Sequence, residues 1–302
     1  MTPRVVAVVV TYNRRELLTE ALTALAAQTR RPDAVVVVDN ASSDGTADLV
    51  RERFGDVELV ELTDNTGGAG GFAVGIAQAL DQDANLIWLM DDDTVPEPAA
   101  LAALLSARER SPAPPALVAS RVVWTDGREH PMNTPRTKPG AGRAELSAAA
   151  AAGCTPIRSA SFVSVLVDAE AVRERGLPIA DYFLWNDDFE FTTRLLRGRV
   201  GLYCPASVVV HKTKTFGGTD VDPGDRFYFE VRNKVWLFTR SRGLAPVERS
   251  LYAASTLRRW ARTYAGSADR TTLRRGLKKG LWDGVRNGPR PTEELLRDVK
   301  SP

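Results

Sequence analysis

Buried-type strands alternate with helical segments over the first ninety residues, and this alternation limits the chain to a small set of folds. Three apolar runs stand out, at 4–10 (RVVAVVV), 34–40 (AVVVVDN) and 85–90 (NLIWLM), with a fourth strand expected at 57–63. The runs lack the apolar–polar alternation of half-exposed strands, so they fit strands buried on both faces. Segments with helical spacing separate them. The pattern predicts an α/β fold with a doubly wound, mostly parallel sheet.

Polar clusters follow each of these strands. They are Thr11–Asn13, Asp39–Asn40, Asp64–Asn65 and Asp91–Asp93. The carboxyl ends of parallel strands meet at one edge of a sheet, where ligands bind in open α/β folds. The sequence therefore predicts a ligand site built from all four clusters.

The pattern changes after residue 95. We expect a helix from Pro96 to 110, strands at 116–124, 159–168 and 201–211, and a helix after 186. A Gly/Pro-rich stretch between 125 and 143 predicts a long loop, able to act as a lid. The last part is helical with mixed Trp and Arg, which suggests two regions. These are a catalytic domain at 1–224 and a basic helical region at 225–302.

Charge is distributed unevenly. Residues 240–302 contain fifteen Lys/Arg against six Asp/Glu, so they carry +9 while the remainder carries −7. A basic end on an acidic body indicates an anionic partner there: membrane phospholipid, a lipid-linked phosphate or nucleic acid. No signal peptide or membrane-spanning run is recognisable, and two cysteines form no framework. We expect a cytoplasmic protein.

Three consecutive aspartates end the run NLIWLMDDD. One explanation is a helix cap with the remaining acids facing water. The other is a Mg²⁺ or Mn²⁺ site, because these cations take carboxylate oxygen ligands together with substrate phosphates. Alternate strand residues point the same way, so Asp91 and Asp93 would face one site and Asp92 another.

The stretch NTGGAGGF at 65–72 is rich in glycine and leads into a helix. Glycines permit close approach of a ligand to the backbone, and a helix N-terminus favours phosphate. The alternative is a tight turn with close packing. Asp39 has a similar pair of explanations: it accepts a hydrogen bond from a nucleotide base, or it caps the next helix.

Three acids lie close together in WNDDFEF: Asp187, Asp188 and Glu190. Clustered carboxylates raise one another's pKa, which suits a general base. Alternatively, acids stabilise a first helical turn and Glu190 pairs with Arg194. Trp185, just before them, is suited to stacking on a sugar or to simple packing.

His211 closes an apolar strand and is followed by two lysines. It is a candidate metal ligand, although a lone histidine is more often structural. Lys212 and Lys214 are candidates for facing phosphate, and Gly217–Gly218 for a loop hinge.

In this order the segments VVVTYNR, VVVDNASSDGT, DNTGGAGGF, WLMDDD, WNDDFEF and VVVH resemble the inverting family 2 glycosyltransferases of GT-A fold. The resemblance covers about residues 4–215. It implies a metal-dependent transfer of a sugar from a nucleoside-diphosphate sugar to a hydroxyl. It also implies Mn²⁺ or Mg²⁺ as the cofactor, held by Asp91, Asp93 and His211.

The resemblance also assigns the remaining residues. Asp188 would be the catalytic base and Asp187 would contact the acceptor. Donor contacts would come from the residues that match the nucleotide-sugar motifs: Thr11, Asn13, Asp39 at the pyrimidine, Asn65, Gly67, Gly68, Asp92, Trp185 and Lys212.

Within the family, NTGGAGGF, the Trp-bearing strand and WNDD resemble actinobacterial galactofuranosyltransferases. UDP-galactofuranose is therefore the first choice of donor and a glycan or lipid-linked molecule the acceptor, in cell-wall synthesis. A dTDP-rhamnose-dependent rhamnosyltransferase is the alternative, and a sugar-nucleotide or anionic-surface binding module is the non-enzymatic one. A nucleotidyltransferase is disfavoured because TYNRRELL lacks a glycine-rich loop. The basic C-terminal region suggests peripheral attachment to the inner face of the plasma membrane; nucleic acid is not expected.

Overall fold

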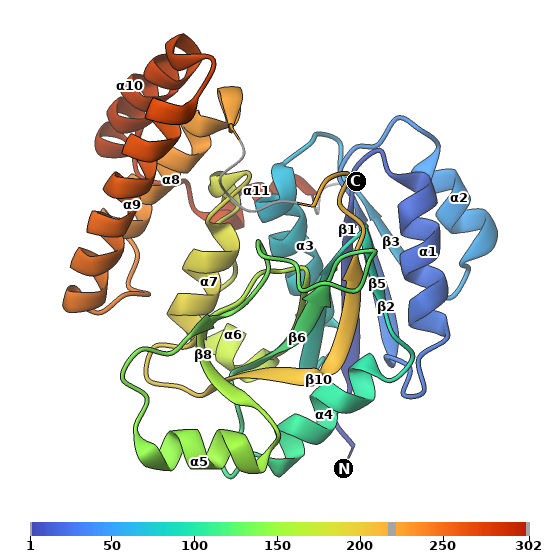
Figure 1. The fold of residues 1–302 in the computed structure, drawn as a ribbon. Helices are drawn as coiled ribbons and strands as arrows, with labels where there is room; N and C mark the ends of the chain where they lie inside the picture. Colours follow the sequence, from blue (N-terminus) through green and yellow to red (C-terminus); the bar gives the residue numbers. More distant parts are fainter. Residues whose placement is uncertain (1, 217–221, 300–302) are drawn as a thin grey trace.

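The computed structural model describes residues 2–216 and 222–299. Its centre is one ten-stranded sheet of order β3-β2-β1-β4-β9-β6-β10-β8-β7, to which β5 adds at β10 (Figure 1). The strands β3, β2, β1 and β4 run parallel to one another, as do β6 and β10, whereas β9 runs antiparallel to β4 and β6. The strands are β1 (Val5–Thr11), β2 (Ala34–Asp39), β3 (Glu58–Glu61), β4 (Leu86–Asp91), β5 (Thr94–Pro96), β6 (Leu117–Val123), β7 (Arg136–Thr137), β8 (Thr155–Ser159), β9 (Ser164–Asp168) and β10 (Gly201–His211).

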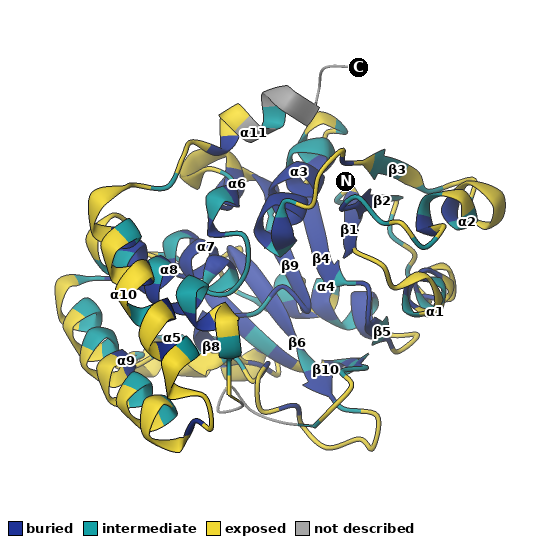
Figure 2. Ribbon diagram, turned by 90° about the horizontal axis from the view of Figure 1, so that it is seen from above, coloured by how far each residue is buried: buried dark blue, intermediate teal, exposed yellow. Residues whose placement is uncertain are grey.

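Helices cover both faces of the sheet, which confirms the predicted doubly wound α/β architecture. One apolar layer lies between the sheet and α3, α6 and α7; the other lies between the sheet and α1, α2 and α4. The helices of the α/β part are α1 (Arg15–Ala26), α2 (Thr46–Arg53), α3 (Gly67–Asp81), α4 (Ala100–Arg110), α5 (Arg143–Ala151), α6 (Ala169–Arg175) and α7 (Asp187–Leu195). Seen from above, the central strands are almost wholly buried (Figure 2), as expected for apolar runs without alternation.

The parallel register brings the predicted polar clusters to one edge. Thr11 at the end of β1 pairs with Asp39 of β2, and Val10 pairs with Asp91 of β4. Helix α3 lies unusually close to β1, because a Cβ at Gly71 would approach a Val10 methyl to 2.5 Å and one at Gly75 a Val8 methyl to 2.3 Å. Part of the glycine-rich stretch therefore serves packing.

Two predicted element boundaries are wrong. The helix expected from Pro96 begins at Ala100, because Thr94–Pro96 forms β5 and pairs antiparallel with β10. The strand expected at 159–168 starts at Ser164, after a turn that follows β8. The first error matters for the site, since the β5–β10 pairing places His211 opposite Thr94, next to the aspartates.

Helices α8 (Phe227–Thr239), α9 (Pro246–Gly266) and α10 (Arg270–Arg286) stand together beside α7, on the side of the sheet away from α1 and α2 (Figure 1). Helix α11 (Thr292–Val299) lies apart from them, against α3, and short 3₁₀ turns occur at Ala180–Tyr182 and Gly224–Arg226. Glycines at 276, 280 and 284 form a stripe on α10, and a Cβ at Gly280 would lie 2.8 Å from the Tyr228 carbonyl oxygen of α8. Only glycine permits this close helix contact. Among the described helices, none is both long and apolar enough to cross a bilayer.

Candidate active site

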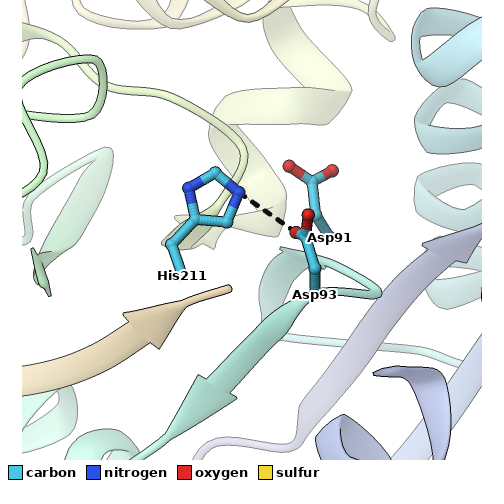
Figure 3. Close-up of side chains that lie close together, drawn as sticks. All are labelled: Asp91, Asp93 and His211. Carbon is cyan, nitrogen blue, oxygen red and sulfur yellow. Dashed lines mark ion pairs between the residues drawn. The ribbon is translucent and has the colours of Figure 1, made fainter. Parts of the chain in front are cut away.

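Three side chains that the sequence analysis assigned to a metal converge at the carboxyl edge of the sheet. Asp91 ends β4, Asp93 lies in the turn before β5, and His211 ends β10. One ligand atom from each lies within 4.8 Å of the other two. Figure 3 shows the imidazole and both carboxylates directed toward a common space. Their arrangement can hold a divalent cation.

The hydrogen bonding of His211 fits metal binding. Its Nδ1 lies 2.9 Å from the side-chain oxygen of Asn133, so Nδ1 carries the proton and donates it. In the neutral ring Nε2 then has a free lone pair, and it lies 3.0 Å from Asp93 Oδ1. Asp93 Oδ1 is buried and has no hydrogen-bond donor. Two acceptors facing each other, here Nε2 and Asp93 Oδ1, need a cation or a proton between them. The hydrogen bond from Nδ1 to Asn133 is of the kind that orients metal-bound histidines.

The charges of the cluster show the same need for a cation. Burial raises the pKa of Asp91 to about 7, and repulsion from Asp93 adds to the rise. Burial opposes the ionised form of Asp93 as well, but His211 and Arg14 hold the pKa of Asp93 below its ordinary value. The pKa of His211 is raised despite burial, because it faces Asp93 and Asp91. A proton on His211 thus takes the place that a divalent cation would fill.

Asp187 and Asp188 open helix α7 across this edge. Asp187 is only 8% exposed, whereas Asp188 is half-buried and accepts a 2.6 Å hydrogen bond from the Phe189 N–H at Oδ1. Burial raises the pKa of Asp187, and the charges of Asp188 and Asp91 add to this. Burial also raises the pKa of Asp188, against the opposing effect of Lys234 and Arg136. The acid pair therefore lies within electrostatic reach of the metal-type cluster, as a general base opposite a bound diphosphate would.

Helix α8 holds the segment that leads into the acid pair. Phe183, Trp185 and Asn186 have φ of 65°, a left-handed conformation that costs non-glycine residues about 1–3 kcal/mol each. The side-chain amide of the fully buried Asn233 lies 2.8–2.9 Å from the carbonyl oxygens of Tyr182, Leu184 and Trp185.

A second contact from α8 completes this support. Glu230 accepts a 2.8 Å hydrogen bond from the Asn186 side chain. Helix α8 of the C-terminal region thus holds the segment that positions Asp187 and Asp188. Sequence reasoning missed Glu230 and Asn233, because single polar residues within a helix have no local signature.

Residues 6–161 match the family model of glycosyl transferase family 2. The chain belongs to glycosyl transferase family 2. Galactofuranosyltransferase GlfT1 of Mycobacterium tuberculosis is 31% identical over 308 residues, covering 95% of this chain and 94% of that protein. GlfT1 of Mycolicibacterium smegmatis is 44% identical over 106 residues, or 35% of each chain. This confirms the predicted family, so the chain is a glycosyltransferase that uses a nucleotide sugar.

Solved structures show the same fold at low sequence identity. Staphylococcus aureus TarS 1–349 in complex with UDP-GlcNAc has a TM-score of 0.65 at 16% identity, covering 97% of this chain and 83% of TarS. The mannosyltransferase PcManGT from Pyrobaculum calidifontis, in complex with GDP-Man and Mn²⁺, has a TM-score of 0.57 at 22% identity, covering 98% and 79%. Both are GT-A glycosyltransferases, and the predicted GT-A fold is confirmed.

In this family 2 enzyme, two residues predicted to contact the donor bind each other. The Thr11 hydroxyl donates a 2.9 Å hydrogen bond to Asp92 Oδ2, and the Tyr12 N–H approaches the same oxygen at 3.3 Å. Arg14, which the sequence analysis did not single out, pairs with Asp92 at 3.1 Å and with Asp93 at 2.6 Å. Its guanidinium is half-exposed and compensates part of the negative charge of the aspartates.

Asn13 and Asp39, both predicted to contact the donor, each accept a hydrogen bond from the loop after β2. Asn13 Oδ1 accepts the Ser43 N–H at 2.8 Å, and Asp39 Oδ1 accepts the Ser42 N–H at 2.9 Å. Asp39 thus stabilises the turn after β2, the local role that was the alternative to base recognition. Its proposed contact with the pyrimidine remains a prediction.

The turn into α3 is built around Gly67. Asn65 Oδ1 accepts the Gly67 N–H at 2.8 Å, and φ at Gly67 is +72°. A Cβ at Gly67 would lie 2.0 Å from the Phe183 carbonyl oxygen, so glycine is required here to bring α3 against the segment before the acid pair. A Cβ at Gly68 would contact nothing within 4 Å. Packing therefore leaves Gly68 free for the donor contact proposed for it.

Four further predictions concern Trp185, Lys212, the Glu190–Arg194 pair and a hinge at Gly217–Gly218. Trp185 is half-buried beside the acid pair, with its carbonyl held by Asn233. The side-chain ammonium of Lys212 pairs with Glu20 of α1, and the backbone N–H of Lys212 donates to the Asp93 backbone carbonyl at 2.8 Å. The expected ion pair of Glu190 with Arg194 forms at 2.9 Å. The proposed hinge at Gly217–Gly218 lies outside the described residues.

Proposed function

We propose that this chain is an inverting, metal-dependent galactofuranosyltransferase that moves the sugar of UDP-galactofuranose to a hydroxyl of a glycan or lipid-linked acceptor. One observation carries the reaction type: the cluster of Asp91, Asp93 and His211 lies within electrostatic reach of Asp187. The name of the relatives that align over nearly the full chain supports the choice of sugar over dTDP-rhamnose.

In the proposed reaction, Asp188 accepts the proton of the acceptor hydroxyl while that oxygen attacks the anomeric carbon. The bond from this carbon to the nucleoside diphosphate breaks in the same displacement, so the configuration inverts. Asp187 orients the acceptor. Mn²⁺ or Mg²⁺ at Asp91, Asp93 and His211 would stabilise the negative charge of the departing diphosphate.

A panel of UDP- and dTDP-sugars, incubated with the enzyme and a water-soluble glycan acceptor, tests this function. We expect release of UDP from UDP-galactofuranose only when acceptor and Mn²⁺ or Mg²⁺ are both present. Release of dTDP from dTDP-rhamnose would instead identify the rhamnosyltransferase. Binding of nucleotide sugars without any release would identify a binding module.

Replacing Asn233 by Ala is expected to lower kcat by about 10²-fold, because a small displacement of the acid pair is enough to misalign the base. The variant removes the amide that holds three carbonyls of the left-handed segment. The KM for the donor should change little. Steady-state kinetics check this, with Asn85→Ala as the control: Asn85 also bonds the backbone, at Arg4 far from the site. Equal losses of kcat in both variants would contradict the positioning role.

We further propose the division of labour predicted from sequence, with residues 1–224 binding the donor and 225–302 lying near acceptor and membrane. Apolar side chains project from α9 and α10 among many basic residues; Val247 is 73% exposed and Trp282 61%. Lys278 precedes Trp282 by one helical turn, and Val285 follows it on the same face. Basic helices with exposed apolar residues bind anionic lipid surfaces, which would place the enzyme on the inner face of the plasma membrane.

Flotation with vesicles tests this attachment. We expect binding to phosphatidylglycerol-containing vesicles that weakens as salt is raised, since exposed charges are screened. Trp282→Ala combined with Lys278→Gln should reduce it, whereas Leu146→Ala, an exposed leucine on α5, should not. Binding that ignores both salt and the α10 substitutions would exclude this surface.

A further inference from the structure

Two cations share an aromatic ring directly beside the proposed base. The Lys234 ammonium lies 4.8 Å from the ring centroid of Phe189, and the Arg136 guanidinium lies 5.8 Å from it. Arg136 also lies 5.6 Å from the Tyr252 centroid, and the two rings meet edge to face at 5.2 Å. Strand β7 and helices α7, α8 and α9 thus each contribute one side chain to a small cluster, next to Asp188.

Neither cation has a bonded counter-ion. Within residues 2–216 and 222–299, no carboxylate lies within ion-pair distance of Lys234 or Arg136, and neither head group makes a hydrogen bond. Lys234 is nevertheless only 8% exposed. A buried ammonium without a partner is costly, and such groups are found where a ligand completes the site.

The nearby carboxylates are too few to balance the cations. Glu230 and Asp188 are the carboxylates that act most on Lys234, whereas Arg259 and Arg136 add positive charge beside it. Glu230 is already engaged, because it pairs with Arg259 and accepts from Asn186 and Trp260. Burial lowers the pKa of Lys234 to about 8, which shows that its charge is under-compensated. When Asp188 takes up a proton in the proposed reaction, the excess of positive charge grows by one.

We propose that Lys234 and Arg136 form a binding site for a phosphate or diphosphate group carried by the acceptor. This inference rests on the proposed function, since it places the acceptor beside Asp188. An anion between the two cations would compensate both charges, and it would do so most strongly when Asp188 is protonated. Phe189 and Tyr252 would cover the apolar part of the same molecule.

A purely local role explains less of the arrangement. Lys234 alone could serve as counter-ion to Asp188. Arg136, however, is exposed on β7 and would be free to turn to water, yet it lies over both rings. The two cations come from different elements, contact the same ring and repel one another, as expected for recognition of a shared anionic ligand.

Calorimetry with phenyl phosphate tests the site in enzyme whose donor site is filled with UDP and Mn²⁺. We expect Lys234→Gln and Arg136→Gln each to weaken phenyl phosphate binding about tenfold, the effect of one charge-assisted contact. Arg136→Lys should restore most of the affinity. The control is Arg274→Gln on the exposed face of α10, which should bind as the wild type does.

The outcomes separate cleanly. Selective loss in the Lys234 and Arg136 variants supports the site, and a parallel titration with decyl diphosphate shows whether a lipid-linked diphosphate is preferred over a free phosphate ester. No phenyl phosphate binding by the wild type, unchanged binding in both variants, or an equal loss in Arg274→Gln would overturn it. Failure of the proposed glycosyl transfer would appear separately, as absence of UDP release in the transfer assay. The phenyl phosphate titration would then be repeated on enzyme without UDP.

Discussion

An Asp188→Asn enzyme is expected to bind UDP and Mn²⁺ as the wild type does but to transfer sugar about 10²–10⁴-fold more slowly, the usual contribution of a general base. The substitution keeps the shape of the side chain and its place at the start of α7 while removing the group that accepts a proton. Donor binding should survive because Asp188 is not among the clustered ligand atoms at the metal-type site. Single-turnover transfer and calorimetry with UDP measure the two properties separately.

Asp187→Asn is the matched control for this experiment. Asp187 is the more buried acid of the pair, and we expect its variant to raise the KM for acceptor more than it lowers the chemical rate. The pH profile gives a second check. Burial raises the pKa of Asp188. Wild-type activity should therefore be lost on acidification at a pH above about 3.9, the ordinary pKa of an exposed aspartate. A rate loss in Asp187→Asn alone would exchange the two roles.

The sheet could be predicted because its signal is local. The runs at β1 and β2 are mostly valine, and such composition suits a strand covered on both faces. Chain order and the parallel register then bring Asp39 and Asp91 to one edge without further information. The candidate metal ligands followed from this register together with the family pattern.

The remainder of the site depends on contacts between distant segments. Thr94–Pro96 is three residues long and includes a proline, so only its pairing with β10 makes it a strand. Asn133 lies in an irregular loop, and its value comes from meeting His211, 78 residues later. Asn233 lies in α8 between two other polar residues, Arg232 and Lys234. No local pattern indicates that it holds the carbonyls before Asp187.

Removing the carboxylate of Asp93 is expected to abolish the metal dependence of donor binding. Asp93→Ala and Asp91→Ala each take one ligand from a three-ligand cluster, which leaves too few to hold a divalent cation beside a diphosphate. UDP affinity measured with Mn²⁺ should then equal that measured with EDTA. Titration of each variant by calorimetry, in both conditions, checks this result.

A graded series makes this prediction specific to the cluster. Asn133→Ala should weaken Mn²⁺-dependent UDP binding by only about 10–100-fold, because it frees the His211 ring without removing a ligand. Asp126→Asn, an exposed acid in a turn, removes the same unit of charge elsewhere on the chain and should have no effect. If charge alone attracted the metal–nucleotide complex, all the aspartate variants would weaken binding alike. If Asp93→Ala kept its response to Mn²⁺, the cation would have to bind elsewhere, and the proposed stabilisation of the leaving diphosphate by this cluster would be wrong.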